Sequence, residues 1–363
     1  MAMYQDYRPM SIAPAPRPAD EVSMRCTGCG GKVGSSVLSA ALARLSIPAS
    51  PHVLLGLDQP DDAAIVQPPG GRPIVATVDF FAAPLDDPYL VGRLAMLNAA
   101  SDVFALGAKP LAALAMATIP LGSAGKQEQL LYEVLAGALE ELRRMGATLV
   151  GGHTIEGPRL TVGFSLLADA GERPAPLKSA LRLGDCLVLT KPLGTGVLLA
   201  AHAQARCHAA WYEELVQAML QSNQFAASLA ERFDVLAITD ITGFGLAGHL
   251  LEMLRASKVS AKLHLDAIPL LAGFEQLAGE GVESTLAPAN RDAEADISAS
   301  VMQRTSPRYT ALFDPQTCGG LLLGVPAEHV SGVLDQLAQN GTAPAAAIGE
   351  VVTGADRSQI TLC

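Results

Sequence analysis

Hydrophobic and polar positions along the chain follow the spacing of strands in some segments and that of helices in others. Short apolar runs bounded by turn residues predict strands at 62–66, 74–78, 111–119, 160–168, 186–190, 236–239, 261–265, 319–325 and 346–352. Apolar residues at helical spacing predict helices at 35–45, 89–106, 126–145, 196–233 with a break near Cys207, 244–256, 270–279 and 327–340. Because both halves mix the two kinds of element, the pattern predicts an α+β or α/β fold with two layers.

Three segments interrupt this pattern. Residues 1–25 are polar and rich in Pro, which predicts a flexible leader. Residues 170–184 change to Gly, Arg, Pro and Lys, which indicates a domain boundary, and the polar, irregular residues 283–309 predict a mobile loop. The chain of 363 residues is long enough for two domains. We therefore expect a Gly-rich loop and first helix at 26–48, an N-terminal α/β domain at 49–170 and a C-terminal α+β domain at 171–363.

Composition and charge exclude several classes of protein. The net charge is −11 and no run of Lys and Arg occurs, which argues against a nucleic-acid-binding protein. No apolar, charge-free run reaches the roughly 18 residues that span a bilayer, and the N-terminus has no apolar signal segment. The six cysteines have no regular spacing, so they do not suggest a disulfide framework. We expect a cytoplasmic protein without a membrane partner.

The first candidate site is the stretch Cys26-Thr27-Gly28-Cys29-Gly30-Gly31-Lys32. Its glycines allow backbone N–H groups to approach an anion, and its Lys can pair with a phosphate. A nearby cation also favours the thiolate, which is the nucleophilic form of Cys. Cys26 and Cys29 could instead be half of a zinc site, a redox pair or two unreactive loop residues, but no second pair of zinc ligands lies nearby. The adjacent Gly-Gly-Lys favours a functional thiol at Cys29.

Carboxylates form the second candidate site. Asp61 and Asp62 precede a predicted strand, Asp79 and Asp240 end two others, and Asp102 lies on the helix 89–106, which Asp87 and Pro88 are suited to start. Mg²⁺ prefers such oxygen ligands, completed by water and substrate phosphates. Asn98 and Asp102 are four residues apart and share a helix face. Each residue alone also fits a cap, a turn or a solvated surface.

Three Gly-rich segments are predicted to be turns that could cradle phosphate. They are Gly151-Gly152-His153-Thr154, Thr242-Gly243-Phe244-Gly245 and Cys318-Gly319-Gly320. None matches the phosphate loop of P-loop NTPases or a dinucleotide-binding fingerprint. His153 could contact a nucleotide, act as an acid or base, or only support the turn, whereas His249 fits a packed helix position.

Taken in order, these segments resemble the selenophosphate synthetases, the selenide, water dikinase family. The matching motifs are Gly28-Cys29-Gly30-Gly31-Lys32, Asp61-Asp62-Ala63-Ala64, Thr77-Val78-Asp79-Phe80-Phe81, Asn98-Ala99-Ala100-Ser101-Asp102-Val103-Phe104-Ala105-Leu106-Gly107, Gly151-Gly152-His153-Thr154, Leu189-Thr190-Lys191-Pro192-Leu193-Gly194, Thr239-Asp240-Ile241-Thr242-Gly243-Phe244-Gly245 and Asp314-Pro315-Gln316-Thr317-Cys318-Gly319-Gly320. Each motif is weak alone, but the ordered set is specific and spans nearly the whole chain after residue 24.

The resemblance implies a reaction, a fold and an assembly. ATP, selenide and water would give selenophosphate, AMP and orthophosphate for the synthesis of selenocysteine and selenouridine. The implied fold is that of the aminoimidazole ribonucleotide synthetase superfamily, in which the N-terminal domains of a homodimer pair into a β-barrel between the subunits. Several Mg²⁺ ions would bind with ATP. A monovalent cation such as K⁺ is a candidate cofactor, and a selenium-delivery protein is a candidate partner.

The resemblance also assigns roles to individual residues. Cys29 and Lys32, in the segment 26–48, match the catalytic thiol and the catalytic Lys of the family. The residues that match Mg²⁺ ligands are Asp62, Asp79, Asp102 and Asp240. The residues that match ATP contacts are Lys32, Gln59, Pro60, Asp61, Asp79, Asp102, Gly152, His153 and Thr154. Because the loop is rich in Gly, we expect it to close over ATP and deliver Cys29 and Lys32.

Two departures and two alternatives accompany the resemblance. Many family members have Cys where this chain has Gly31, and Ser is common where it has Cys318. Thiamine-monophosphate kinases and hydrogenase-maturation proteins share the acidic motifs but lack the Cys-x-x-Lys loop. A non-catalytic nucleotide-binding or selenium-carrier protein is the alternative from a different class.

Overall fold

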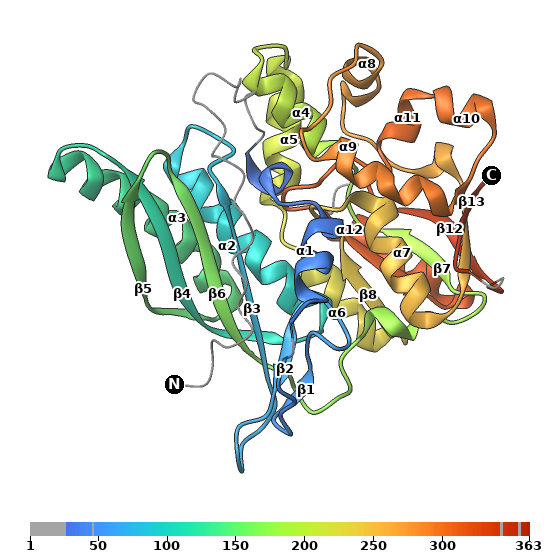
Figure 1. Ribbon diagram of the computed structural model, residues 1–363, viewed down its shortest axis with the longest axis horizontal. Helices are drawn as coiled ribbons and strands as arrows, with labels where there is room; N and C mark the ends of the chain where they lie inside the picture. Colours follow the sequence, from blue (N-terminus) through green and yellow to red (C-terminus); the bar gives the residue numbers. More distant parts are fainter. Residues whose placement is uncertain (1–26, 46, 342–343, 355–356) are drawn as a thin grey trace.

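The computed structural model describes residues 27–45, 47–341, 344–354 and 357–363, and its strands form two sheets. The predicted leader at 1–25 and Cys26 lie outside the described residues. The first sheet has six strands in the order β1-β2-β3-β6-β4-β5, and the second has seven in the order β10-β13-β9-β12-β7-β11-β8. Figure 1 shows the two sheets in separate halves of the molecule, with helices in both. The predicted mixture of helices and strands is confirmed.

The first sheet is built from residues 53–169. Its strands are β1 (Val53–Leu55), β2 (Ala64–Val66), β3 (Ile74–Ala82), β4 (Lys109–Pro120), β5 (Thr148–Gly157) and β6 (Thr161–Asp169). The helices α2 (Pro88–Ala105) and α3 (Ala124–Met145) lie along this sheet and pack against each other (Figure 1). Asp87 caps α2 as predicted, because its side chain accepts the Leu90 N–H at 3.0 Å.

The long helix α2 joins the two halves of the molecule. It packs against β3 and β6 of the first sheet and against β8 of the second. The side chains of Asn98 and Ser101 are buried between these elements. Asn98 and Asp102, which the sequence places on one helix face, both contact β3 through Asp79 and Thr77. The helix therefore carries polar groups into the junction between the two sheets.

The second sheet is built from residues 186–362. Its strands are β7 (Cys186–Leu189), β8 (Ala237–Asp240), β9 (Ser260–Leu263), β10 (Ile297–Ser298), β11 (Leu321–Val325), β12 (Ala346–Val352) and β13 (Ile360–Leu362). Its main helices are α4 (Thr195–Ala203), α5 (Ala209–Leu220), α6 (Gln224–Arg232), α7 (Gly245–Ser257), α8 (Phe274–Gly279) and α12 (Val330–Gln339). The helical region predicted at 196–233 breaks near Cys207 as expected, and again at 221–223.

The structure corrects two predictions about the first sheet. Gly151-Gly152-His153-Thr154 is not a turn but part of β5, which pairs in parallel with β4. A Cβ at Gly152 would lie 2.2 Å from the Ala115 carbonyl oxygen, so Gly at this position permits close strand pairing rather than a turn. Asp79, predicted to end a strand, lies inside β3.

The prediction of a mobile loop at 283–309 is also wrong, because this segment forms helices and a strand. It forms α9 (Ala287–Asn290), η4 (Arg291–Asp296), β10, α10 (Val301–Thr305) and α11 (Pro307–Thr310). Asn290 donates to the carbonyls of Gly243 and Phe313, and Asp296 pairs with Arg255 at 2.6 Å. These partners are distant in sequence, so the local pattern of polar residues does not reveal them.

Candidate active site

The Gly-rich loop forms the short 3-10 helix η1 (Gly28–Gly31), followed by α1 (Ser35–Leu42), and it sits at the junction of the two halves. The Cys29 N–H donates to Thr317 Oγ1 at 3.0 Å, and the Thr285 hydroxyl donates to the Gly30 carbonyl at 3.3 Å. Both partners belong to the C-terminal half of the chain. The loop is therefore closed against that half in this structure.

Gly28 shows why this loop needs glycine. Its φ of 60° lies in the left-handed region, and a Cβ there would lie 2.4 Å from Thr317 Oγ1. Any side chain would push the loop away from the residue that holds the Cys29 N–H. The loop sequence is thus tied to the position of the thiol.

Lys32 faces the first sheet. Its Nζ lies 2.9 Å from Asp79 Oδ2, and the same carboxylate oxygen accepts the Asn98 amide at 2.5 Å. Burial lowers the pKa of Lys32, but the neighbouring Cys29 and Asp79 raise it, and the net shift of this pKa is upward. The ammonium therefore stays charged and is held by Asp79, and its contact with a phosphate stays a prediction.

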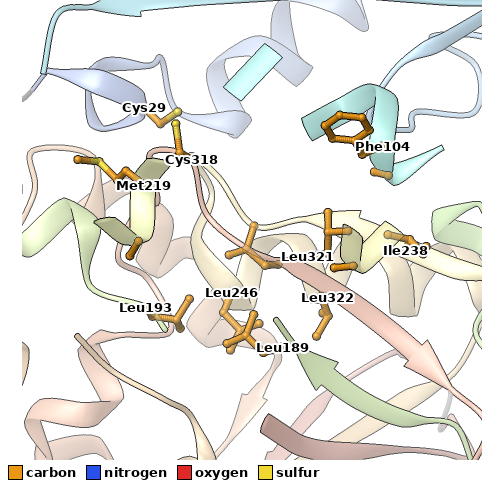
Figure 2. Close-up of a cluster of buried hydrophobic side chains, with 14 of the residues drawn as sticks. Cys29, Phe104, Leu189, Leu193, Met219, Ile238, Leu246, Cys318, Leu321 and Leu322 are labelled. Carbon is orange, nitrogen blue, oxygen red and sulfur yellow. The ribbon is translucent and has the colours of Figure 1, made fainter. Parts of the chain in front are cut away.

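The Cys29 side chain is fully buried (0% exposed), and its thiol donates to Asn98 Oδ1 at 3.7 Å. Figure 2 shows it next to Cys318, above a cluster of buried aliphatic side chains. Burial raises the pKa of Cys29 to about 12, whereas Lys32 acts to lower it. The sequence thus predicts the direction of the Lys32 effect, but burial outweighs it. In the closed loop Cys29 is a thiol, not a thiolate.

Three carboxylates gather beneath the loop. Asp240 ends β8, Asp102 accepts the Thr77 hydroxyl at 2.6 Å, and Asp62 accepts the Thr239 hydroxyl at 3.0 Å. Burial, and then the charge of Asp240, raises the pKa of Asp102 well above its usual range. Burial, and then the charge of Asp62, raises the pKa of Asp240 to about 6. Burial and the neighbouring like charges therefore both favour the protonated form of these carboxyl groups.

This carboxylate cluster fits a divalent cation. Asp62 and Asp240 each keep one buried carboxylate oxygen without a hydrogen-bond partner. A bound cation would supply both the missing partner and the missing positive charge. Within the described parts of the chain, no three His, Cys, Asp or Glu side chains are yet close enough to surround one ion. A cation bound here would therefore need further ligands, such as substrate phosphates, to complete its coordination.

Two family models match the chain in order. The AIR synthase related protein N-terminal domain matches residues 60–168, and the corresponding C-terminal domain matches residues 182–360. A selenide, water dikinase from Burkholderia ambifaria is 38% identical over 335 residues, covering 92% of this chain and 94% of that protein. Another, from Clostridioides difficile, is 34% identical and covers 90% of this chain and 93% of that protein.

The chain belongs to the selenide, water dikinase family.

A solved structure confirms the fold that this family membership implies. Thiamine-monophosphate kinase from Stenotrophomonas maltophilia superposes with a TM-score of 0.63 at 22% identity, covering 90% of this chain and 94% of that one. The predicted two-domain α+β fold of the aminoimidazole ribonucleotide synthetase type is therefore confirmed. At this identity the superposition shows the fold alone.

The structure separates the residues predicted to contact ATP into two groups. Lys32, Asp79 and Asp102 lie at the loop and the carboxylate cluster, whereas Gly152, His153 and Thr154 are exposed on β5, at the far edge of the first sheet. The strands β6 and β4 separate β5 from the strand that carries Asp79. Within one chain, the two groups do not form a single site.

The segment 59–61, which is predicted to contact ATP, precedes β2. Gln59 and Pro60 are exposed, while both Asp61 carboxylate oxygens accept backbone N–H groups, from Asp62 at 2.8 Å and from Lys178 at 3.0 Å. Burial, and then the charge of Asp62, raises the pKa of Asp61 to about 6. In this structure Asp61 supports the position of Asp62.

The sequence reasoning missed one cation. Lys178, in the short helix η2 (Lys178–Ala180), is buried and lies 2.8 Å from Asp62 Oδ1 and 3.1 Å from Glu252 Oε2. It neutralises one carboxylate of the cluster. It lies in the segment interpreted as a domain boundary, and a single Lys in a polar linker gives no signal of such a position.

Among the residues that the structure describes, we find no helix that is both long enough and apolar enough to cross a membrane.

Proposed function

We propose that this enzyme is a selenophosphate synthetase, which converts ATP, selenide and water into selenophosphate, AMP and orthophosphate. The observation that carries the proposal is the closed loop that holds Cys29 and Lys32 above buried carboxylates. This loop occurs in a chain 38% identical to a selenide, water dikinase over nearly its whole length. Its product would serve selenocysteine and selenouridine synthesis.

Asp62, Asp102 and Asp240 would hold divalent cations, with Mg²⁺ as the expected metal. When bound, Mg²⁺ neutralises developing charge on the phosphates during phosphoryl transfer. Asp79 is paired with Lys32 in the present structure. With ATP bound, Lys32 turns its ammonium from this carboxylate to a phosphate oxygen, and Asp79 becomes available to metal. The ion pair thus keeps both groups in place until ATP arrives.

The side chain of Cys29, a residue of the closed loop, is buried away from solvent. A buried thiol of raised pKa does not react as a nucleophile until its environment changes. Opening of the loop relieves the burial and leaves the charge of Lys32 three residues away, which favours the thiolate. We propose that selenide enters in the open state, and that closure excludes bulk water from the soft, oxygen-sensitive substrate.

The function is tested by a product assay under anaerobic conditions. Purified protein with ATP, Mg²⁺ and selenide is expected to release AMP, orthophosphate and selenophosphate in equal amounts, with little AMP when selenide is left out. Phosphorus NMR identifies the selenophosphate, and chromatography identifies the nucleotide. ADP as the sole nucleotide product would indicate another kinase of the same fold. Absence of any turnover would leave a binding or carrier protein.

We also propose that two copies of the chain pair through the first sheet. The face of this sheet opposite α2 exposes large apolar side chains on three of its strands, β3, β4 and β5. They are Val78 (57% exposed), Phe80 (59%), Leu114 (41%), Val150 (58%) and Ile155 (53%). Several large apolar side chains exposed on one sheet indicate an interaction site. Pairing of two such faces is the arrangement expected of an intersubunit β-barrel, and it would bring the exposed Gly152, His153 and Thr154 of one copy toward the other.

The double substitution V78D/F80D is expected to convert the dimer into a monomer, because it places two charges on the apolar face of β3. Sedimentation equilibrium measures the mass before and after the change. The matched control is V301D, since Val301 is also highly exposed (80%) but lies on α10, away from this sheet. Wild-type protein that sediments as a monomer, or a V78D/F80D variant that remains dimeric, would contradict the proposed interface.

A further inference from the structure

Two thiols that are distant in sequence meet at the side chain of Asn98. The Cys29 thiol donates to Asn98 Oδ1 at 3.7 Å, and the Cys318 N–H donates to the same oxygen at 2.9 Å. The Cys29 N–H is also bonded to Thr317, the residue directly before Cys318. Figure 2 shows the two sulfur atoms facing each other. The synthetase reaction as proposed uses Cys29 and leaves Cys318 without a function.

Cys318 is held more firmly than Cys29. It lies in the loop before β11, its carbonyl accepts the buried ammonium of Lys191 at 2.9 Å, and its thiol donates to the Leu94 carbonyl at 3.2 Å. Its φ of 53° lies in the left-handed region, which a residue with a side chain adopts at a cost. In contrast, Cys29 belongs to a four-residue helix that contains three glycines. Cys318 is thus the fixed partner and Cys29 the movable one.

We propose that Cys29 and Cys318 form a dithiol site that hydroperoxides convert into a disulfide, which fixes the Gly-rich loop in its closed position. The inference goes beyond the synthetase reaction, since it needs only the two thiols and an oxidant. The disulfide would remove the thiol of Cys29 and prevent the loop from opening. Reduction by an external dithiol would restore both.

The oxidation proceeds in two balanced steps. With the loop open, the Cys29 thiolate attacks one oxygen of the hydroperoxide, the O–O bond breaks, and a sulfenic acid and an alcohol (or water) form. After closure, the sulfur of Cys318 attacks the sulfenic sulfur, the S–O bond breaks, and hydroxide leaves as water with the proton of the Cys318 thiol. Two thiols thus lose two electrons to one hydroperoxide.

Nearby cations suit these steps. Lys32 lies three residues from Cys29, and Lys191 contacts the backbone of Cys318. Burial raises the pKa of both thiols in the closed loop, and each Lys acts to lower the pKa of its neighbouring thiol. Opening of the loop should therefore control the first step, and the second requires the closed geometry.

Peptide mapping tests the site without measuring synthetase activity. Trypsin cleaves after Arg25 and Lys32, which places Cys26 and Cys29 on one peptide of residues 26–32, whereas Cys318 lies on residues 309–357. The experiment therefore starts from the C26S variant, in which Cys29 is the only cysteine on the peptide of residues 26–32. After treatment with hydrogen peroxide, mass spectrometry without reduction should detect these two peptides linked, and dithiothreitol should separate them.

Three further measurements define the site. In C26S/C318S the linked peptide should fall to the level of untreated protein, and Cys29 should instead collect as sulfinic or sulfonic acid. In the matched control C26S/C186S, which alters a half-buried cysteine of β7, the linked peptide should persist. Oxidised native C26S should also resist cleavage after Lys32, because the disulfide holds the loop closed.

Linkage of Cys29 to another cysteine, or full oxidation of C26S without linkage to residues 309–357, would overturn the proposal. So would a protein whose thiols remain reduced while a peroxide-reactive control thiol is consumed. None of these outcomes depends on selenide or ATP, so failure of this proposal is distinguishable from failure of the proposed function.

Discussion

Replacing Asp240 with Asn is expected to lower the rate of AMP formation by about a thousandfold at saturating ATP. The carboxylate ends β8, is buried, and has one oxygen without a hydrogen-bond partner. A divalent cation contributes several kcal/mol of charge stabilisation in phosphoryl transfer, and each ~1.4 kcal/mol is a factor of ten in rate. Asn has nearly the same shape but lacks the charge, so the loss should occur without unfolding.

The same variant should respond differently to metal. In the wild-type protein, Mg²⁺ is expected to raise the melting temperature, because it relieves the repulsion among Asp62, Asp102 and Asp240. In D240N this shift should be small, while the metal-free protein should be at least as stable as wild type. D234N is the matched control, since Asp234 is exposed and pairs only at the surface with Arg182. Full activity of D240N would contradict the assignment of Asp240 as a metal ligand.

The metal-free protein should also show a defined pH dependence. The pKa of Asp240 is about 6 in the folded state, against a usual value near 3.8. Between these values the folded state binds more protons than the unfolded state, so the free energy of unfolding falls as the pH rises through this window. Urea unfolding at pH 4.5 and pH 6.5, with EDTA and then with Mg²⁺, measures the effect. Mg²⁺ should reduce the pH dependence.

Replacing Lys32 with Gln is expected to reduce kcat by about a hundredfold to a thousandfold, the usual loss when one donor to a developing negative charge is removed. The variant should also raise the KM for ATP, because Asp79 would then face the phosphates without a neighbouring cation. Its melting temperature should change little, since the side chain of Lys32 is 31% exposed and partly solvated ion pairs contribute little stability. Steady-state kinetics with varied ATP measures both effects.

Two comparison variants separate the function of Lys32 from that of the thiol. C29S should lose selenide-dependent turnover while keeping the KM for ATP, since Cys29 acts on the selenium side of the reaction. K262Q should behave as wild type, because Lys262 is a half-exposed lysine in an ion pair with Glu350 on the second sheet. Full selenide-dependent activity of C29S would overturn the function given to this thiol. Unchanged kinetics of K32Q would do the same for the phosphate contact.

Local chemistry explains why the sequence predicts much of the site. Asp87 and Pro88 mark the start of α2, and the four-residue spacing of Asn98 and Asp102 is enough to place both on the face toward β3. Asp240 follows an apolar run and indeed ends β8. In each case the information lies within one turn of helix or one strand, where backbone geometry fixes the direction of the side chains.

The errors have a common physical cause in long-range contacts. The sequence predicts a turn at Gly152, but this residue lies in β5, where glycine allows close approach of the Ala115 carbonyl of β4. The sequence of residues 283–309 shows no regular pattern, because Asn290 and Asp296 bond to residues that are distant in the chain. Lys178 lies in a polar linker and gains its position only from Asp62 and Glu252.

The sequence by itself determined the mixed helix and strand pattern, the Gly-rich loop with Cys29 and Lys32, and the ordered acidic motifs that indicate a selenide, water dikinase. Only the tertiary structure decided the protonation of Cys29, because its pKa depends on burial by elements more than 60 residues away. Only the tertiary structure also paired Lys32 with Asp79 and brought Cys318 to the loop. Sequence motifs specify which groups are present, but the folded chain sets the distances and the solvent exclusion on which their charges depend.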